Sequence, residues 1–507
     1  MNAPRPSNPA IARAISKPGV KSGGLRFSEV EIQGLFGHEA AEDEIPKRLQ
    51  DYYFKTDTFD EFQSDVPLRL VVGHKGIGKS ALIQIAMLEN KKSGILSILI
   101  KPDDIADIAT DTTDHLRTVR LWKDGLIRII SSRALEGVGA VFGDELAGRV
   151  ASTSGNIISF LRETLKTKDK YDLKPVNEGI IDSFLKTGQI SVFIDDLDRG
   201  WKGRQEDITR ISALLNATRD LVNENRGLKI RISLRSDVYY LVRTSDESTD
   251  KIEGSVMWLS WTNHEIFVLL VKRIETFFSR AIVDDSLLDL NANRLARYLD
   301  PVMMPKFEGA GLWQDAPIHK VLMSLIRKRP RDLVKLCTLA ARSARKNKNS
   351  LIATKDFQSV FSEYSQGRIR DTINEYRSEL PEIERLILGM KPSKKEKKTS
   401  EGYLYDTAAL LKKIDNIVAG GDFYFASGKK ATKKELAAFM YKINFLTARR
   451  DRDNQKIARS YFEENRYLSN EFVDFGFDWE VHPAYRWALQ PDNLESIFET
   501  LALSDDD

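Results

Sequence analysis

One segment of eight residues constrains the fold of this chain more than any other part of its sequence. It matches the pattern G-x-x-x-x-G-K-[ST] in full and reads Gly73-His74-Lys75-Gly76-Ile77-Gly78-Lys79-Ser80. Glycines at this spacing let the backbone curl so that successive N–H groups point at phosphate oxygens. An apolar run precedes the segment at 68–72, and a helical pattern follows it at 80–89. The sequence therefore predicts a strand, a phosphate-binding loop and a helix.

The residues at the end of this loop have distinct predicted roles. Lys79 is long enough to reach the β- and γ-phosphates, and the Ser80 hydroxyl is suited to bind Mg²⁺. The helix that begins here adds its positive N-terminal end, so the backbone through Ala81 is expected to bind phosphate as well. Residues Gly73 to Ala81 thus predict a site for a nucleoside triphosphate with Mg²⁺.

A second group of polar residues follows a strand further along the chain. The predicted strand at 190–194 is apolar except for Ser191, and it runs into Asp195-Asp196-Leu197-Asp198-Arg199. In a parallel sheet the carboxyl ends of the strands form the ligand edge, which places Asp195 to hold Mg²⁺. Asp196 is then placed to orient and deprotonate the attacking water. Two interpretations of Asp198 and Arg199 stay open: a local ion pair, or an arginine that reaches a neighbouring subunit.

Apolar strand-like runs alternate with helical patterns through the first half of the chain. Further strands are expected at 95–100 and 228–234, with helices at 116–135 and 205–223. This alternation predicts an α/β fold, in which helices cover both faces of a parallel sheet. From 263 to 390 the patterns are helical, so strands are expected to stop there.

Shifts in composition divide the chain into successive predicted parts. A chain of 507 residues exceeds what one hydrophobic core organises, so more than one domain is expected. Glycines near 136–143 indicate a loop, and 136–189 is expected to be an insertion or a mobile segment. The predicted parts are a flexible tail (1–25), a phosphate-loop core (26–262), a helical lid (263–390), a charged linker (391–402) and a winged-helix-like domain (403–503).

The charge balance and the composition exclude several classes of protein. The 77 basic and 74 acidic side chains nearly cancel, giving a formal charge of +3, so any basic surface must be local. The single cysteine, Cys337, rules out an internal disulfide and a cysteine-based metal site. No apolar run is long enough to span a membrane, and the N-terminus lacks the apolar core of a signal peptide. A cytoplasmic protein without a membrane partner is therefore expected.

The motifs taken together resemble those of a known group of proteins. The motifs are the phosphate loop, the acidic strand end and a third predicted strand that ends in Leu234-Arg235-Ser236-Asp237. This combination resembles the AAA+-related STAND and KAP NTPases, and within them bacterial P-loop ATPases of uncertain function. Phe36-Gly37 fits the same resemblance, which covers about residues 30–390. It extends more loosely to the segment His482-Pro483-Ala484-Tyr485-Arg486.

The resemblance implies roles that the spacing alone does not assign. Arg235 matches a sensor arginine that contacts the γ-phosphate, and Arg331 matches a second sensor arginine in the lid. Phe36 and Gly37 fall where such proteins pack the adenine ring, which makes ATP the expected nucleotide. The plainer alternatives are an ion pair of Arg235 with Asp237 or Asp195, a surface charge at Arg331 and an ordinary packed ring at Phe36.

The function expected from the resemblance is an ATP-dependent regulatory switch. AAA+ unfoldases usually carry Asp-Glu where this chain has Asp195-Asp196, and the shorter side chain favours slow turnover. In this hypothesis ATP closes the lid on the core and changes the interaction with an effector or regulatory protein. At the level of the group, the expected setting is bacterial defence against phage.

Two other functions stay open. An ATPase of the origin-recognition or loader type would bind double-stranded DNA through the basic run Arg449-Arg450-Asp451-Arg452, with Lys456 and Arg459 downstream, although such runs are also common on solvated surfaces. A scaffold that holds ATP without hydrolysing it is the third hypothesis. A homo-oligomer is expected if Arg199 or Arg243 acts as a finger in trans, and a monomer if Arg235 alone completes the site.

Overall fold

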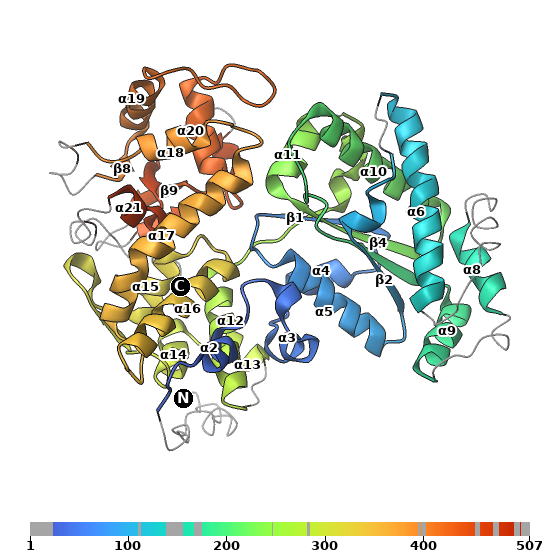
Figure 1. Ribbon diagram of the computed structural model, residues 1–507, viewed down its shortest axis with the longest axis horizontal. Coiled ribbons are helices and arrows are strands. Elements are labelled where there is room, and N and C mark those ends of the chain that lie inside the picture. Colours follow the sequence, from blue (N-terminus) through green and yellow to red (C-terminus); the bar gives the residue numbers. More distant parts are fainter. Residues whose placement is uncertain are drawn as a thin grey trace, which may run out of the picture.

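The computed structural model describes most of the chain. Figure 1 shows a part built on a sheet beside a part made mainly of helices, with the C-terminal elements, orange to red, at the upper left. The predicted tail at 1–25 lies outside the described residues except for its last two positions. The described residues are 24–109, 113–137, 156–166, 175–245, 247–280, 284–393, 396, 402–451, 457–469, 476–490 and 497.

A five-stranded sheet forms the centre of the first part. Its strands are β1 (Leu68–Gly73), β2 (Leu96–Ile100), β3 (Ile190–Ile194), β4 (Leu228–Arg235) and β5 (Val256–Trp258). Their spatial order is β2-β3-β4-β1-β5, and every neighbouring pair runs parallel. β4 therefore lies between the strand that leads into the phosphate loop and the strand that ends before Asp195.

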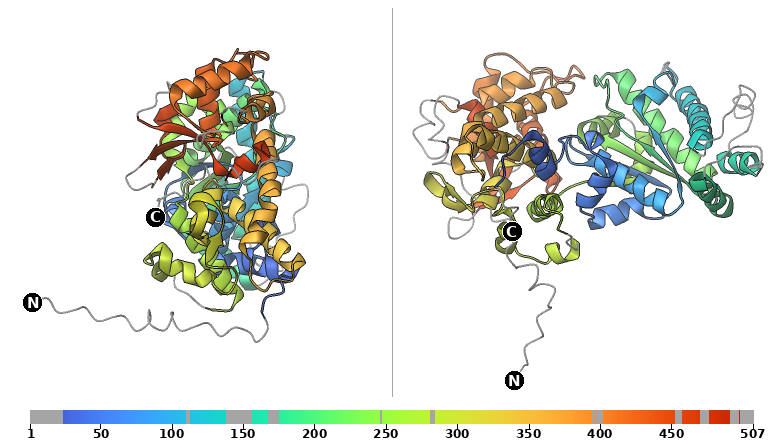
Figure 2. Two further views of the ribbon diagram at one scale, coloured as in Figure 1. Left: turned by 90° about the vertical axis from the view of Figure 1, so that its left-hand side faces the viewer. Right: turned by 60° about the horizontal axis from the view of Figure 1, so that its bottom comes forward.

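Helices cover both faces of this sheet, as the sequence predicted. They are α4 (Asp57–Gln63), α5 (Lys79–Lys92), α6 (His115–Gly137), α8 (Ile157–Leu165), α9 (Pro175–Thr187), α10 (Gln205–Glu224) and α11 (Ser236–Ser245). Val72 and Ile230 join an apolar core with α6, α8, α9 and α10, whereas Val71 and Phe193 join another core with α4 and α5. Figure 2 shows helices on both sides of the sheet. The predicted α/β class is confirmed.

The described residues of 136–189 pack on the same core. Asn156 caps α8, because its side chain accepts a hydrogen bond from the N–H of Ser159. Leu161 of α8 and Phe184 of α9 are buried in the core that α6 shares. The other residues of this predicted insertion, 138–155 and 167–174, lie outside the described part of the chain.

The predicted lid region is helical but contains one short hairpin. Its elements are α12 (Asn263–Phe277), α13 (Asp284–Leu288), α14 (Ala292–Ala296), β6 (Lys306–Glu308), β7 (Gln314–Pro317), α15 (Ile318–Leu325), α16 (Pro330–Lys346), α17 (Thr354–Tyr376) and α18 (Ile383–Gly389). The expectation that strands stop after 263 is wrong, because β6 and β7 pair in antiparallel fashion. Strands this short show no run of alternating residues. An N-terminal helix, α2 (Glu29–Phe36), packs against α12 and α16.

Residues 402–490, here called the C-terminal segment, combine helices with a four-stranded antiparallel sheet. The elements are β8 (Leu404–Tyr405), α19 (Thr407–Val418), α20 (Lys433–Lys442), β9 (Leu446–Asp451), β10 (Ile457–Ser460), β11 (Asp478–Val481) and α21 (Pro483–Leu489). Two helices followed by the β9–β10 hairpin stand in the order that a winged helix requires, and that assignment stays a prediction. Among the described residues, no helix has the length and apolar character needed to cross a membrane.

Candidate nucleotide-binding site

A cavity lies at the carboxyl-end edge of the parallel sheet, where the sheet meets the lid. Parts of the chain far apart in sequence meet there: the phosphate loop, the ends of β3 and β4, helices α12 and α16, and helix α3 (Pro46–Tyr52) with the loop before it. Of the residues with predicted roles, the cavity is lined by Lys75, Gly76, Gly78, Lys79, Ser80, Ala81, Asp195, Asp196, Arg235 and Arg331. The structure thus brings together most of the phosphate loop, both aspartates and both arginines, whereas Gly73, His74 and Ile77 do not line the cavity.

The phosphate loop has the backbone shape that its glycines permit. Gly78 takes a φ of 110° immediately before α5, a conformation that other residues rarely adopt. The Lys79 amine then folds back and donates to the carbonyl oxygens of Gly73 and His74, at 2.8 and 3.1 Å. Burial lowers the pKa of Lys79, and the nearby carboxylate of Asp198 opposes that shift. A phosphate in the cavity would favour the charged form of this amine.

Asp195 stands at the end of β3, where its carboxylate is held by hydrogen bonds. The Ser233 hydroxyl donates to Oδ1 from the neighbouring strand β4, and the Asp196 N–H donates to the same oxygen at 2.9 Å. Sequence reasoning did not identify Ser233 as a site residue. The contact between Ser233 and Asp195 becomes evident only from the strand order, which places β4 beside β3.

Asp196 adopts an unusual backbone conformation at the cavity. Its φ is 61°, which is uncommon for a residue with a side chain and recurs at functional sites. Its carboxylate pairs with Arg199, with 3.0 Å between Oδ2 and Nε. Burial and the negative charge of Asp198 raise the pKa of Asp196, while Arg199 opposes the shift. A carboxylate with a raised pKa is better suited to accept a proton from water.

Arg235 is engaged by carboxylates within the chain. Its guanidinium donates to both oxygens of Asp237, at 2.9 and 2.5 Å, and to Asp198 at 3.2 Å. It also donates to the carbonyl oxygen of Glu375 at 2.6 Å. Burial alone lowers the pKa of Arg235, but these negative charges more than offset burial and raise it. The structure therefore contains the ion pair with Asp237, and the phosphate-sensing role stays a prediction.

Arg331 enters the cavity from the first turn of α16. Its Nε donates to the carbonyl oxygen of Glu39 at 3.0 Å, and its own N–H lies 3.4 Å from the carbonyl oxygen of Gly76. The lid and the phosphate loop are thus in direct contact through the residue that was predicted as the lid sensor.

Phe36 and Gly37 do not line the cavity. Phe36 is fully buried in the apolar core, so the ordinary packed ring describes it. Gly37 has a φ of 77°, and a Cβ at this position would lie 2.9 Å from Nη1 of Arg273. The Phe36 carbonyl oxygen accepts a hydrogen bond from Arg273, which lines the cavity together with His38 and Glu39.

The wall on the side of the lid was not predicted. Tyr52, Trp261 and Arg273 line the cavity there, and the guanidinium of Arg273 lies 4.4 Å from the centroid of the Tyr52 ring. The Trp261 ring nitrogen donates to the carbonyl oxygen of Ile77 at 2.7 Å and so fastens this wall to the phosphate loop. Nε of Arg273 is buried and has no hydrogen-bond partner among the described residues. Apolar and aromatic walls with a few polar atoms suit a nucleotide base.

The donor groups in this cavity fit a nucleoside triphosphate and Mg²⁺. The Ser80 hydroxyl and the Asp195 carboxylate are oxygen ligands of the kind that Mg²⁺ prefers, and both line the same cavity. Mg²⁺ keeps several waters in such sites, so two ligands from the protein suffice. The backbone at the start of α5 and the Lys79 amine supply positive charge beside them.

Comparisons with known proteins found one family match and one relative of similar sequence. Residues 287–373 match a family described as the FunZ-associated C-terminal helical domain, and the match falls inside the predicted lid. The chain is 24% identical over 515 aligned positions to the "Putative transposon gamma-delta 80.3 kDa protein" of Escherichia coli K12. That alignment covers 91% of this chain and 69% of the relative.

The solved structures found by comparison share little sequence with this chain and have low TM-scores against it. The Walker-type ATPase PABY2304 of Pyrococcus abyssi shares 14% identity, with a TM-score of 0.40, over 92% of this chain and 100% of its own. The Aeropyrum pernix ORC2 protein, solved as ADPNP-ADP complexes, shares 11% identity with a TM-score of 0.38 over 90% and 93% of the two chains. At these scores the similarities add no argument about function.

Proposed function

We propose that this chain binds ATP with Mg²⁺ in the cavity described above and hydrolyses it slowly as a regulatory switch. The observation that carries the proposal is the meeting of Lys79, Ser80, Asp195 and Asp196 at one edge of the sheet. Lys79 and the loop backbone bind the phosphates, and Ser80 and Asp195 hold the metal ion. When bound, Mg²⁺ neutralises charge that develops on the phosphates. Asp196 orients the attacking water and accepts its proton.

The same cavity supports a switch because two parts of the chain build it. Arg273 and Arg331 come from the lid, whereas Lys79 and Asp195 come from the sheet. A nucleotide that contacts both parts binds best when they are close together, so its presence shifts the equilibrium toward the closed arrangement. Slow turnover follows from Asp196, whose short carboxylate is also paired with Arg199.

Replacing Asp196 by asparagine is expected to separate binding from hydrolysis. The amide cannot accept a proton, so the hydrolysis rate should fall by about 10²–10⁴-fold, while ATP affinity changes little. Single-turnover formation of ADP and equilibrium binding of ATP measure the two effects. Asp103→Asn is the matched control, because the exposed Asp103 also pairs with Arg199 but lies outside the cavity. Unchanged hydrolysis in Asp196→Asn would remove Asp196 from the chemistry.

The partner in this proposal is an effector or regulatory protein whose binding depends on the nucleotide. The setting in defence against phage rests on the resemblance alone. Neither candidate for an arginine finger is free of contacts within the chain: Arg199 pairs with Asp196 and Asp103, and Arg243 pairs with Asp250 and Glu253. A homo-oligomer that uses either arginine must first break these pairs.

DNA binding of the loader type is the second candidate function, but the C-terminal basic run supports it weakly. Arg459 is buried and donates to Glu480 at 2.7 Å, and Arg449 pairs with Asp451 and Glu480. Burial raises the pKa of Glu480, but Arg459 and Arg486 outweigh burial and lower it. Arg449 and Arg459 are therefore already paired within the C-terminal sheet, whereas Arg450 of the run is exposed. Arg452 and Lys456 lie outside the described residues.

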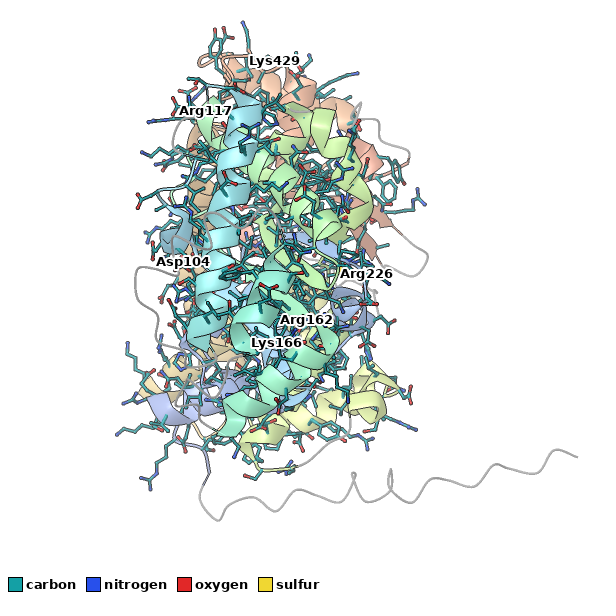
Figure 3. The ribbon with its side chains drawn as sticks, turned by 90° about the vertical axis from the view of Figure 1, so that its right-hand side faces the viewer. Asp104, Arg117, Arg162, Lys166, Arg226 and Lys429 are labelled. Carbon is teal, nitrogen blue, oxygen red and sulfur yellow. The ribbon has the colours of Figure 1, made fainter. Side chains whose placement is uncertain are left out.

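A different surface favours the DNA hypothesis. Arg117, Arg120 and Arg128 are exposed on one stripe of α6, interrupted by Asp124. Figure 3 shows this face, with Arg162 of α8 and Lys166, which follows α8, beside it. Reversing the charge of the three arginines to glutamate should abolish binding of double-stranded DNA and its steep salt dependence. Fluorescence anisotropy with a labelled duplex measures both, and a wild-type chain without salt-dependent binding would exclude this function.

A further inference from the structure

The phosphate loop is held on a second side, away from the cavity. The Lys75 N–H donates to the Glu375 carboxylate of α17 at 3.0 Å. Arg329 bridges the same two residues, since Nη1 lies 3.2 Å from Glu375 Oε2 and 3.3 Å from the Lys75 carbonyl oxygen. Neither Glu375 nor Arg329 lines the cavity. The lid therefore fixes the loop without occupying the place of a phosphate.

The side chain of His74 extends this attachment to the C-terminal segment. Its Nδ1 lies 2.6 Å from the Tyr376 hydroxyl of α17 and 3.0 Å from the Ser236 hydroxyl of α11. Its Nε2 pairs with Glu463, which follows β10. The Asn444 side chain, between α20 and β9, donates to both oxygens of Glu463 at 3.0 and 3.1 Å. We call His74 with these four partners the His74 latch.

The latch is a polar cluster whose members depend on one another, and all of them are buried except Glu463, whose side chain is 13% exposed. His74 is 2% exposed, and Tyr376 is fully buried. Burial raises the pKa of Glu463, but the attraction of His74 and the hydrogen bonds from His74 and Asn444 outweigh it and lower that pKa to about 2. The geometry fits a ring that donates from Nε2 to Glu463, with Nδ1 facing the hydroxyls of Tyr376 and Ser236. Removing one partner leaves the others unsatisfied in a dry environment, which is costly.

We propose that the His74 latch couples nucleotide binding in the cavity to docking of the C-terminal segment. The inference rests on the proposed nucleotide function and names how that site is regulated. The latch holds the loop in the shape in which Gly76, Gly78, Lys79 and Ser80 line the cavity, so a nucleotide does not have to order the loop when it binds. A docked segment therefore raises nucleotide affinity. By linkage, the nucleotide strengthens docking of the segment by the same factor.

Replacing Glu463 by alanine in the full chain tests this coupling. In the absence of nucleotide, hydrogen exchange of the amides at 73–80 should become faster, because the loop loses its attachment. Dissociation of a fluorescent ATP analogue with Mg²⁺ should become about tenfold faster. In the wild type the analogue should slow exchange at 440–450, and in Glu463→Ala it should not. Glu463→Gln, which keeps the volume of the side chain, should show the same changes to a smaller extent.

The neighbouring carboxylate provides the matched control. The Glu464 carboxylate pairs with Lys328 and accepts a hydrogen bond from the Tyr461 N–H at 2.9 Å but does not contact His74, so Glu464→Ala should leave exchange at 73–80 at the wild-type rate. Equal exchange at 73–80 in the wild type, Glu463→Ala and Glu463→Gln would overturn the latch. Because that comparison needs no nucleotide, it separates the two claims. A wild type that binds no ATP would overturn the proposed function, while the exchange rates would still decide whether the latch holds the loop.

Discussion

Replacing Lys79 by alanine should lower the rate of ATP hydrolysis by about 10²–10³-fold and weaken ATP binding. The amine lies near the carboxylates of Asp195 and Asp198, so its removal leaves negative charge where the phosphates must lie. Arg235 cannot replace it directly, because Arg235 is held by Asp198 and Asp237. Steady-state release of phosphate with saturating ATP and Mg²⁺ measures the rate.

The control for this substitution lies on the same helix. Lys92 is in the last turn of α5, is exposed and pairs with Glu89 on the surface. Lys92→Ala should therefore keep the wild-type rate. Hydrolysis that survives in Lys79→Ala at the wild-type rate would come from another site or from a contaminant, and the proposed cavity would then have no role in it.

Replacing Asp332 by alanine should destabilise the folded chain by about 3–5 kcal/mol. Asp332 is buried at the start of α16 and accepts hydrogen bonds from Arg327 at 2.7 and 2.9 Å and from Arg368 of α17. Arg327 also donates to Thr372 and to the Tyr485 hydroxyl of α21. Without the carboxylate, two buried guanidinium groups repel each other where the lid meets the C-terminal segment. Urea denaturation of the purified variants measures the loss.

The pH dependence of this contribution follows from the same contacts. Burial raises the pKa of Asp332, but Arg327 and Arg368 outweigh burial and lower it. A carboxyl with a lowered folded-state pKa contributes stability that is present above the unfolded value, about 3.9, and is lost as pH falls toward the folded value. The exposed pair of Glu384 with Arg377 is the control, and Glu384→Ala should cost about 1 kcal/mol or less. Equal losses in the two variants would contradict the role of Asp332.

The phosphate loop and the acidic strand end could be predicted because each is written in consecutive residues. Gly73 to Ser80 and Asp195-Asp196 are local patterns, and the parallel sheet follows from alternating strands and helices. The hairpin of β6 and β7 was missed because strands of three and four residues show no detectable period.

Long-range packing accounts for what the sequence did not reveal at the site. Tyr52 lies on α3, Trp261 in the loop before α12, and Arg273 on α12. They line one cavity although no regular sequence spacing links them. The partners of His74 lie up to 389 positions away in Glu463, so only the folded chain identifies them. Ser233 likewise meets Asp195 because β4 inserts between β1 and β3.

Calorimetric titration of ATP into the wild-type chain, with and without Mg²⁺, tests the central claim most directly. Saturable binding to one site, strengthened by Mg²⁺ and lost in Lys79→Ala, is the result that the structure predicts. A parallel titration with GTP shows whether the cavity distinguishes the two bases. Absence of saturable binding, or binding that is equally strong in Lys79→Ala, would contradict the assignment of this cavity as a nucleotide site.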